Sequence, residues 1–241
     1  MSKTKIIAHR GASGYAPENT IAAFKKAIEM KADGIELDVH LTKDGRLAVV
    51  HDEKLGRTSN GKGLIMDYTF EELRMLDFGS WYSPEYENER IPALEEVMEL
   101  TEGWHGILNI EIKAVPRLFK NGIEDNVISI IKNYNRESNV IVSSFNHDIL
   151  ARIKNKAPEI KVGILYSHVL ASPWKYAVDI GAYAIHPEFK TVTAETVACC
   201  HKYNIAVNCW TVNNPDDIKL MASMNVDNII TNYPDIARNL L

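Results

Sequence analysis

Short apolar runs of β-strand character alternate with amphipathic helical stretches along almost the whole chain. Eight runs are rich in β-branched and apolar residues: 5–9, 34–41, 106–114, 139–145, 160–166, 182–187, 205–212 and 226–231. The stretches between them carry apolar residues at helical spacing, as Ile21, Phe24 and Ile28 do after the sequence PENT. Eight β/α units in 241 residues predict a parallel TIM (β/α)8 barrel. A doubly wound open sheet is the alternative.

One interval is too long for an ordinary connection between a strand and a helix. About forty residues separate His51 from Ile91, whereas such loops usually take about 2–6 residues. The interval contains a turn-rich RTSNGKG sequence and a short helical stretch, TFEELRML, in which Thr69 and Glu72 have capping-box spacing. We therefore predict one barrel domain over 1–241, with an insertion at about 52–90 that lies over one mouth of the barrel.

Composition and charge argue against several classes of protein. The chain is 46% hydrophobic and 24% charged, as globular proteins are, and its net charge of −5 without a long basic run argues against a nucleic-acid partner. The N-terminus turns polar after three apolar residues, and no segment approaches the about 18 apolar residues of a membrane span. We therefore expect a cytoplasmic protein without a stable membrane anchor.

Its three cysteines form no CxxC pair, so neither a disulfide framework nor a zinc knuckle is expected. Nothing in the sequence indicates an oligomeric state.

Polar side chains occupy one face of two consecutive predicted strands. Polar and charged residues alternate with apolar ones in the second and third runs: Glu36, Asp38 and His40, then Asn109, Glu111 and Lys113. The outer face of a parallel barrel is covered by helices, so the apolar residues should point outward and the polar ones into the barrel. Barrel enzymes place their active sites at the C-terminal ends of the strands. The pattern therefore predicts a functional site.

The acids of this face predict a metal site. Residues two apart on a strand are about 6.6 Å apart along the chain, so Glu36 and Asp38 could flank one cation, with Glu111 approaching from the neighbouring strand. Three such carboxylates repel one another unless positive charge lies between them. Oxygen ligands favour one divalent cation, Mg2+ or Ca2+. The alternative is a metal-free network in which the acids pair with Arg10 and Lys113.

Two histidines end β runs and complete the candidate chemistry. His9 closes the first run, and His51 follows RLAVV. Paired histidines beside a cation suit general acid and base catalysis, while Arg10 and Lys113 suit the binding of phosphate oxygens. We expect His40 to form hydrogen bonds rather than to bind metal. These residues predict a phosphoester site; an aldolase that forms a Schiff base on Lys113 is the alternative, although imine chemistry does not require these histidines and acids.

In their order along the chain, these elements resemble the glycerophosphodiester phosphodiesterase family. The resemblance lies in HRG, PENT, ExD, HD and ExK, within IIAHRGASGYAPENTIAAF, GIELDVHLTKDGRLAVVHDEKLGRTSNGKG and NIEIK, and returns weakly at CWTVN and IITNYP. It implies a TIM barrel with a small inserted subdomain after the second strand. It also implies metal-dependent hydrolysis of small glycerophosphodiesters, such as glycerophosphocholine or glycerophosphoethanolamine, to sn-glycerol 3-phosphate and an alcohol.

The same resemblance implies roles for individual residues. The three acids would hold the cation, Arg10 and Lys113 would hold phosphate oxygens, and His9 and His51 would act as acid and base. A glycerol hydroxyl would attack phosphorus, and water would then open the cyclic phosphate. We assign His9 as the base and His51 as the acid of the first step, an order that the sequence does not fix. A lysophospholipase D-like reaction and a non-catalytic phosphodiester-binding barrel are the alternative functions.

Further residues are singled out by the resemblance. Phe145 and Trp210 would wall the glycerol pocket, although aromatic residues at strand ends are as often plain packing. Glu18 and Asn19 of the PENT sequence are expected to brace the first loop, with Asn19 capping the helix that follows. Near the last strand the family commonly has TDxP, whereas this chain has Asn232. We expect activity to survive this change because an amide can still form a hydrogen bond.

Overall fold

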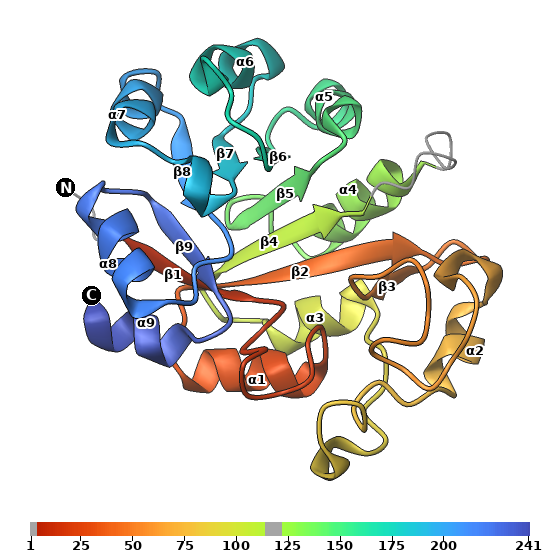
Figure 1. Ribbon diagram of the computed structural model, residues 1–241. Coiled ribbons are helices and arrows are strands. Elements are labelled where there is room, and N and C mark those ends of the chain that lie inside the picture. Colours follow the sequence, from red (N-terminus) through yellow and green to blue (C-terminus); the bar gives the residue numbers. More distant parts are fainter. Residues whose placement is uncertain (1–3, 114–121) are drawn as a thin grey trace.

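The structure, a computed structural model, describes residues 4–113 and 122–241, and its central feature is a closed barrel of eight parallel strands (Figure 1). The strands are β1 (Lys5–His9), β2 (Gly34–Leu41), β4 (Ile107–Ile112), β5 (Val140–Ser144), β6 (Lys161–Tyr166), β7 (Ala184–Pro187), β8 (Ala206–Cys209) and β9 (Asn228–Thr231). Strand β1 pairs in parallel with both β2 and β9, which closes the barrel. The predicted barrel is confirmed, and the open sheet is wrong. Ala114, predicted to end the third strand, and residues 1–3 lie outside the described ranges.

Each predicted strand is found, but the last three are shorter than the sequence suggested. Strands β7, β8 and β9 contain four residues each. The difference arises because apolar residues such as Ile205 and Val226 are buried just before a strand without belonging to it. Burial and ladder pairing are separate requirements, and an apolar run reports only the first.

Helices cover the outer face of the barrel. They are α1 (Ile21–Glu29), α3 (Leu94–Leu100), α4 (Ile123–Asn133), α5 (His147–Lys156), α6 (Pro173–Ile180), α7 (Ala194–Lys202), α8 (Pro215–Ser223) and α9 (Pro234–Leu240). Phe24 of α1 belongs to the same buried cluster as Leu37 of β2 and Leu108 of β4. The apolar residues of these strands therefore face the helices, and the intervening polar residues face the barrel interior. Within the described ranges, no helix has the length and apolar character needed to cross a membrane.

The long interval builds a small core of its own beside β2 (Figure 1, orange to yellow). Strand β3 (Leu47–Val49) pairs antiparallel with β2, and the inserted segment, residues 50–93, follows it. It contains helix α2 (Phe70–Arg74) and the short 3-10 turns η1 (Ile65–Asp67) and η2 (Pro84–Tyr86). The predicted capping box of Thr69 and Glu72 is confirmed. The buried side chains of this core include Leu55, Ile65, Phe70, Leu73, Phe78 and Ala93, which cluster with Ala48 of the edge strand β3.

Hydrogen bonds also hold the inserted segment against the loop between β1 and α1. The hydroxyl of Tyr82 donates to the carbonyl oxygen of Gly14 at 2.9 Å. The hydroxyl of Tyr86 donates to the carbonyl oxygen of Tyr15 at 3.1 Å. The segment therefore contacts two sides of the barrel mouth, the edge strand β3 and the first loop.

Candidate active site

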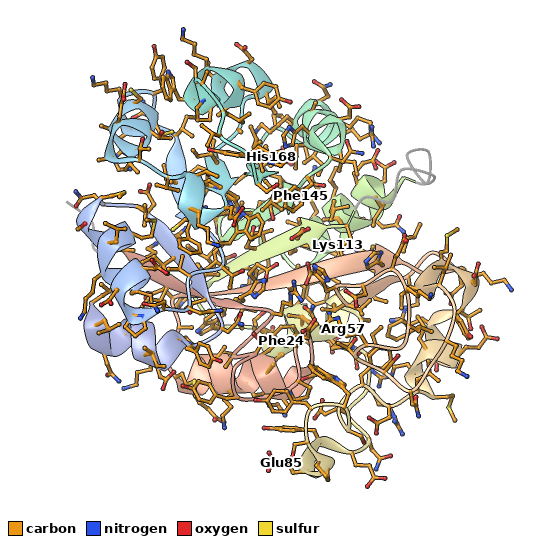
Figure 2. All side chains as sticks on the ribbon, in the orientation of Figure 1. Phe24, Arg57, Glu85, Lys113, Phe145 and His168 are labelled. Atoms are coloured by element: carbon orange, nitrogen blue, oxygen red, sulfur yellow. The ribbon has the colours of Figure 1, made fainter. Side chains whose placement is uncertain are left out.

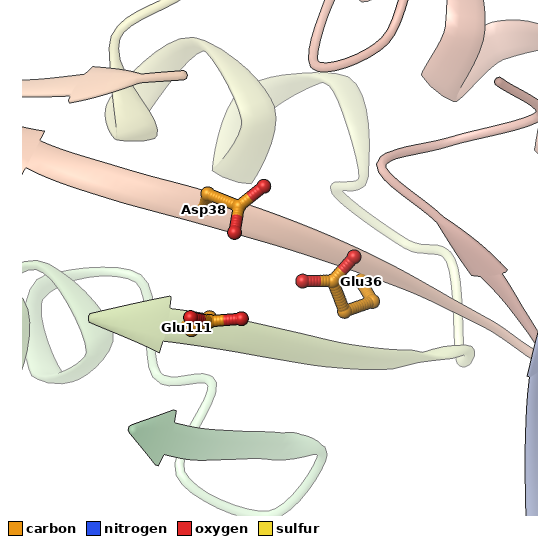
Figure 3. A group of neighbouring side chains, drawn as sticks. All are labelled: Glu36, Asp38 and Glu111. Atoms are coloured by element: carbon orange, nitrogen blue, oxygen red, sulfur yellow. The ribbon is translucent and has the colours of Figure 1, made fainter. Parts of the chain in front are cut away.

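Strand register brings the three predicted acids together. Asp38 of β2 is paired with Glu111 of β4, and Glu36 lies two residues earlier on the same face of β2. All three side chains belong to buried residues, and one oxygen from each lies within 4.8 Å of the others. Figure 3 shows the carboxylates turning into one space between the two strands. The alternation read from the sequence therefore produces a compact carboxylate cluster.

Two cationic side chains approach this cluster. Arg10 Nε lies 3.4 Å from Asp38 Oδ2, and Lys113 Nζ lies 2.6 Å from Glu111 Oε1 and 3.5 Å from Asp38 Oδ1. Glu36 accepts a hydrogen bond at 2.9 Å from the backbone N–H of Arg10. These are the pairings that a metal-free network requires. They place two full positive charges beside three carboxyl groups, so the charges balance only if one acid is protonated or another cation is bound.

The pKa shifts of the three acids show where negative charge is in excess. Burial, followed by the nearby charges of Asp38 and Glu111, raises the pKa of Glu36 well above its ordinary value. Burial and Asp38 raise the pKa of Glu111 to about 7. Burial also opposes ionisation of Asp38, but Arg10 and Lys113 outweigh it and hold the pKa of Asp38 far below its usual range. The cluster of three acids therefore has an excess of negative charge that its neighbouring cations do not fully offset.

The cluster fits a hard divalent cation. Its donors are carboxylate oxygens, the ligands that Mg2+ and Ca2+ prefer. Among the described residues, Asp38 Oδ1 is buried and accepts no hydrogen bond, and Lys113 Nζ approaches it only to 3.5 Å. A bound cation would satisfy this oxygen and remove the repulsion that raises the pKa of Glu36.

Both candidate histidines face a small cavity beside this cluster. His9, Arg10, Glu36, His51, Glu111 and Lys113 line a cavity of about 80 Å³. His9 Nδ1 lies 2.7 Å from Asn232 Oδ1, and His51 Nδ1 lies 2.6 Å from Asp52 Oδ1. Amide and carboxylate oxygens are acceptors, so each Nδ1 carries hydrogen and each Nε2 is left for a substrate.

Burial lowers the pKa of both imidazoles. For His9, burial and the adjacent Arg10 lower the pKa to about 4. For His51, burial lowers the pKa, although the charge of Asp38 and the bond to Asp52 oppose this shift. Burial would raise the pKa of Asp52, but hydrogen bonds from Arg57 and His51 lower it to about 2. Asp52 is therefore ionised and able to orient His51.

The PENT sequence braces the site as expected, but one detail of the prediction is wrong. Asn19 adopts a left-handed conformation, with φ of 58°, and its Nδ2 donates to Asp38 Oδ2 at 2.8 Å. Thr20 caps α1 instead, accepting the backbone N–H of Ala23. Glu18 accepts a hydrogen bond from Arg10 at 2.8 Å. The first loop thus fixes both Asp38 and Arg10.

His40 forms a hydrogen bond, as predicted. Its Nε2 donates to the backbone oxygen of His51 at 2.9 Å.

The predicted aromatic residues lie across the cavity, where Phe145 and Trp210 make an edge-to-face contact with ring centroids 5.6 Å apart. Trp210 Nε1 donates to the backbone oxygen of His186. The cavity therefore has one charged wall and one apolar wall.

Sequence reasoning missed two polar residues beside His51. Asp52 orients its ring, and Arg57 of the inserted segment forms hydrogen bonds with Asp52. Arg57 also lines, with Lys113 and Phe145, an adjoining groove of about 630 Å³; Figure 2 labels these three side chains. The HD pair and the RTSNGKG stretch contained both residues, but neither stretch indicates on its own which side chains turn toward the barrel.

Comparison with known proteins gives an independent result. Residues 9–236 match the model of the glycerophosphoryl diester phosphodiesterase family. The chain is 47% identical over 239 residues to a glycerophosphodiester phosphodiesterase of Caldanaerobacter subterraneus subsp. tengcongensis, covering 99% of this chain and 98% of the relative. It is 45% identical over 237 residues to one of Bacillus altitudinis, covering 97% and 96%. A solved Oleispira antarctica phosphodiesterase, in complex with the product sn-glycerol-3-phosphate, is similar with a TM-score of 0.93 at 29% identity, covering 99% and 96%.

Proposed function

The chain belongs to the glycerophosphoryl diester phosphodiesterase family, and we propose that it hydrolyses small glycerophosphodiesters to sn-glycerol 3-phosphate and an alcohol in a metal-dependent reaction. Glycerophosphocholine and glycerophosphoethanolamine are the proposed substrates. One observation carries the proposal: two oriented histidines line the same small cavity as Glu36 and Glu111, two members of an acidic cluster that fits a cation. The product complex of the Oleispira antarctica relative supports the choice of product.

The first task of the site is to offset negative charge on the phosphoryl group. A divalent cation held by Glu36, Asp38 and Glu111 would polarise a phosphoryl oxygen and offset negative charge in the transition state. Arg10 and Lys113 line the same cavity and would hold the other phosphate oxygens. Arg10 suits this role because Glu18 and Asp38 hold its guanidinium at the wall of the cavity. The loop that holds Arg10 thus presents a fixed donor to the substrate.

Proton transfer is the second task. His9 Nε2 would take the proton of the attacking glycerol hydroxyl, and His51 in its doubly protonated form would give its Nε2 proton to the oxygen of the departing alcohol. When water opens the cyclic phosphate, the two imidazoles would exchange these roles. The neutral amide of Asn232 supports His9 as a base with a free Nε2, while the carboxylate of Asp52 stabilises positive charge on His51.

A second candidate function is a lysophospholipase D-like reaction. Beyond Phe145, which is 47% exposed, lies a groove of about 640 Å³ whose lining includes Leu165, Leu170 and Tyr176. Phe145 and Leu165 also line the catalytic cavity, so the two spaces adjoin. An acyl chain on the glycerol of a lysolipid would find apolar contacts there. Turnover of lysophosphatidylcholine that exceeds turnover of glycerophosphocholine would favour this candidate.

Removal of divalent cations is expected to abolish product release. The wild-type protein would be assayed against a panel of glycerophosphodiesters and lysolipids after chelation, and again with Mg2+ or Ca2+ restored. We expect sn-glycerol 3-phosphate to appear only with cation, because otherwise the phosphate would face an acidic cluster with excess negative charge. Activity that is indifferent to chelation would contradict the metal role. Protection against heat by a substrate that is never cleaved would favour a non-catalytic binding barrel.

A further inference from the structure

Arg57 of the inserted segment holds two carboxylates at once. Its Nε and Nη2 donate to the Asp52 oxygens at 2.6 and 3.2 Å. Its Nη1 and Nη2 donate to the Glu18 oxygens at 3.0 and 2.7 Å. Both contacts have the forked geometry that a guanidinium forms with a carboxylate and that a lysine cannot reproduce.

Each of these carboxylates has a second partner in the candidate active site. The other contact of Asp52 is the Nδ1–H of His51 at 2.6 Å. The other contact of Glu18 is Nη1 of Arg10 at 2.8 Å. One guanidinium therefore connects Asp52, which orients the proposed acid, to Glu18, which holds the Arg10 side chain proposed to bind phosphate, although Asp52 and Glu18 lie in different loops of the barrel mouth.

We propose that Arg57 is a positioning residue for the reaction: it fixes His51 and Arg10 relative to one another, so that the inserted segment completes the active site. The proposal rests on the proposed function. Its physical basis is orientation, since a displacement of about 1 Å in a catalytic group can lower a rate by about 100-fold. Asp52 follows a short strand and is partly exposed, so it needs a partner to keep its carboxylate in line with the imidazole.

The inserted segment has other means of staying in place. Its buried core packs on the barrel edge, and Tyr82 and Tyr86 tie it to the first loop. Arg57 lies outside that core, and its side chain is 46% exposed, so its removal leaves no cavity in the core. The loss of Arg57 should therefore affect the rate more than the folding of the segment.

The test compares Arg57→Ala and Arg57→Lys with two matched controls. We expect Arg57→Ala to lower kcat for glycerophosphocholine by about 10- to 100-fold with little change in the melting temperature, and Arg57→Lys to recover only part of the loss. Arg74→Ala removes another arginine of the segment, one that pairs with both oxygens of Glu96 at 2.9 and 2.8 Å. Tyr86→Phe removes a tether to the first loop. Both controls should keep the wild-type kcat.

A second readout separates positioning from general loosening. The ring Nδ1–H proton of His51 should give a slowly exchanging downfield NMR signal, which Arg57→Ala should weaken and both controls should retain. Losses in Arg57→Ala and Asp52→Asn should be less than additive in the double variant, since both act on His51. Unchanged kcat in Arg57→Ala, equal losses in the controls, or fully additive losses would overturn the proposal. A wild-type protein that cleaves no glycerophosphodiester would instead overturn the proposed function.

Discussion

Replacement of His51 by alanine is expected to lower kcat for glycerophosphodiester hydrolysis by at least about 100-fold, the usual contribution of a general acid or base. The departing alcohol is a poor leaving group unless its oxygen is protonated, and in the proposed mechanism His51 gives it a proton from Nε2. The fold should persist because the side chain is 30% exposed and the backbone oxygen that His40 contacts is retained. Steady-state kinetics and a thermal melt of the same preparation provide the measurement.

His9→Ala should show a loss of similar size, since an unassisted hydroxyl is a weak nucleophile. His168→Ala is the matched control: His168 is an exposed histidine near the same mouth of the barrel, labelled in Figure 2, and does not line the catalytic cavity. Its kcat should equal that of the wild type. Near-native turnover in His9→Ala or His51→Ala would remove that histidine from the mechanism.

The acidic cluster was predictable because two regular features of strands determine it. The alternation of side chains fixes which residues of β2 face inward, and the parallel register of neighbouring strands brings Asp38 opposite Glu111. Neither feature depends on the course of a loop. The barrel itself follows from the same regularity, repeated in eight β/α units.

The residues that position the two histidines were harder to predict from the sequence. Asn232 contacts His9 across 223 positions, and Arg57 contacts Glu18 across 39. Both contacts depend on barrel closure and on the path of the inserted segment, which a linear pattern does not encode. The error at Asn19 has a local cause. Its left-handed backbone turns the side chain toward Asp38, and the next residue becomes the cap.

Asn232 illustrates how a departure from a family pattern can preserve a contact. Its Oδ1 accepts the Nδ1–H of His9, as a carboxylate at the same place would. What differs is charge, because an amide orients the imidazole without stabilising its protonated form. The structure thus gives a physical basis for the expectation that activity survives, while activity itself stays a prediction.

Glu36→Gln is expected to abolish turnover and yet to stabilise the protein when no divalent cation is present. A neutral amide is a weaker ligand for the cation, so kcat should fall by at least about 100-fold. The same change removes one of three mutually repelling carboxylates from a buried cluster. In chelator, the free energy of unfolding should therefore rise by about 0.5–2 kcal/mol, the gain common for single stabilising substitutions.

Thermal melts with and without cation test both halves of this prediction. The wild type should gain stability on addition of Mg2+ or Ca2+, by about 2.7 kcal/mol at one hundred times the dissociation constant, whereas Glu36→Gln should gain much less. Glu85→Gln makes the same chemical change at an exposed position of the inserted segment, outside the cavity and grooves of the candidate site, and should alter neither melting nor turnover. A less stable Glu36→Gln protein in chelator would mean that the Glu36 carboxylate is already satisfied by Arg10 and its neighbours, as a metal-free network requires. Greater stability together with lost turnover would mean that the Glu36 carboxylate destabilises the cation-free protein but is required to bind the cation that the reaction uses.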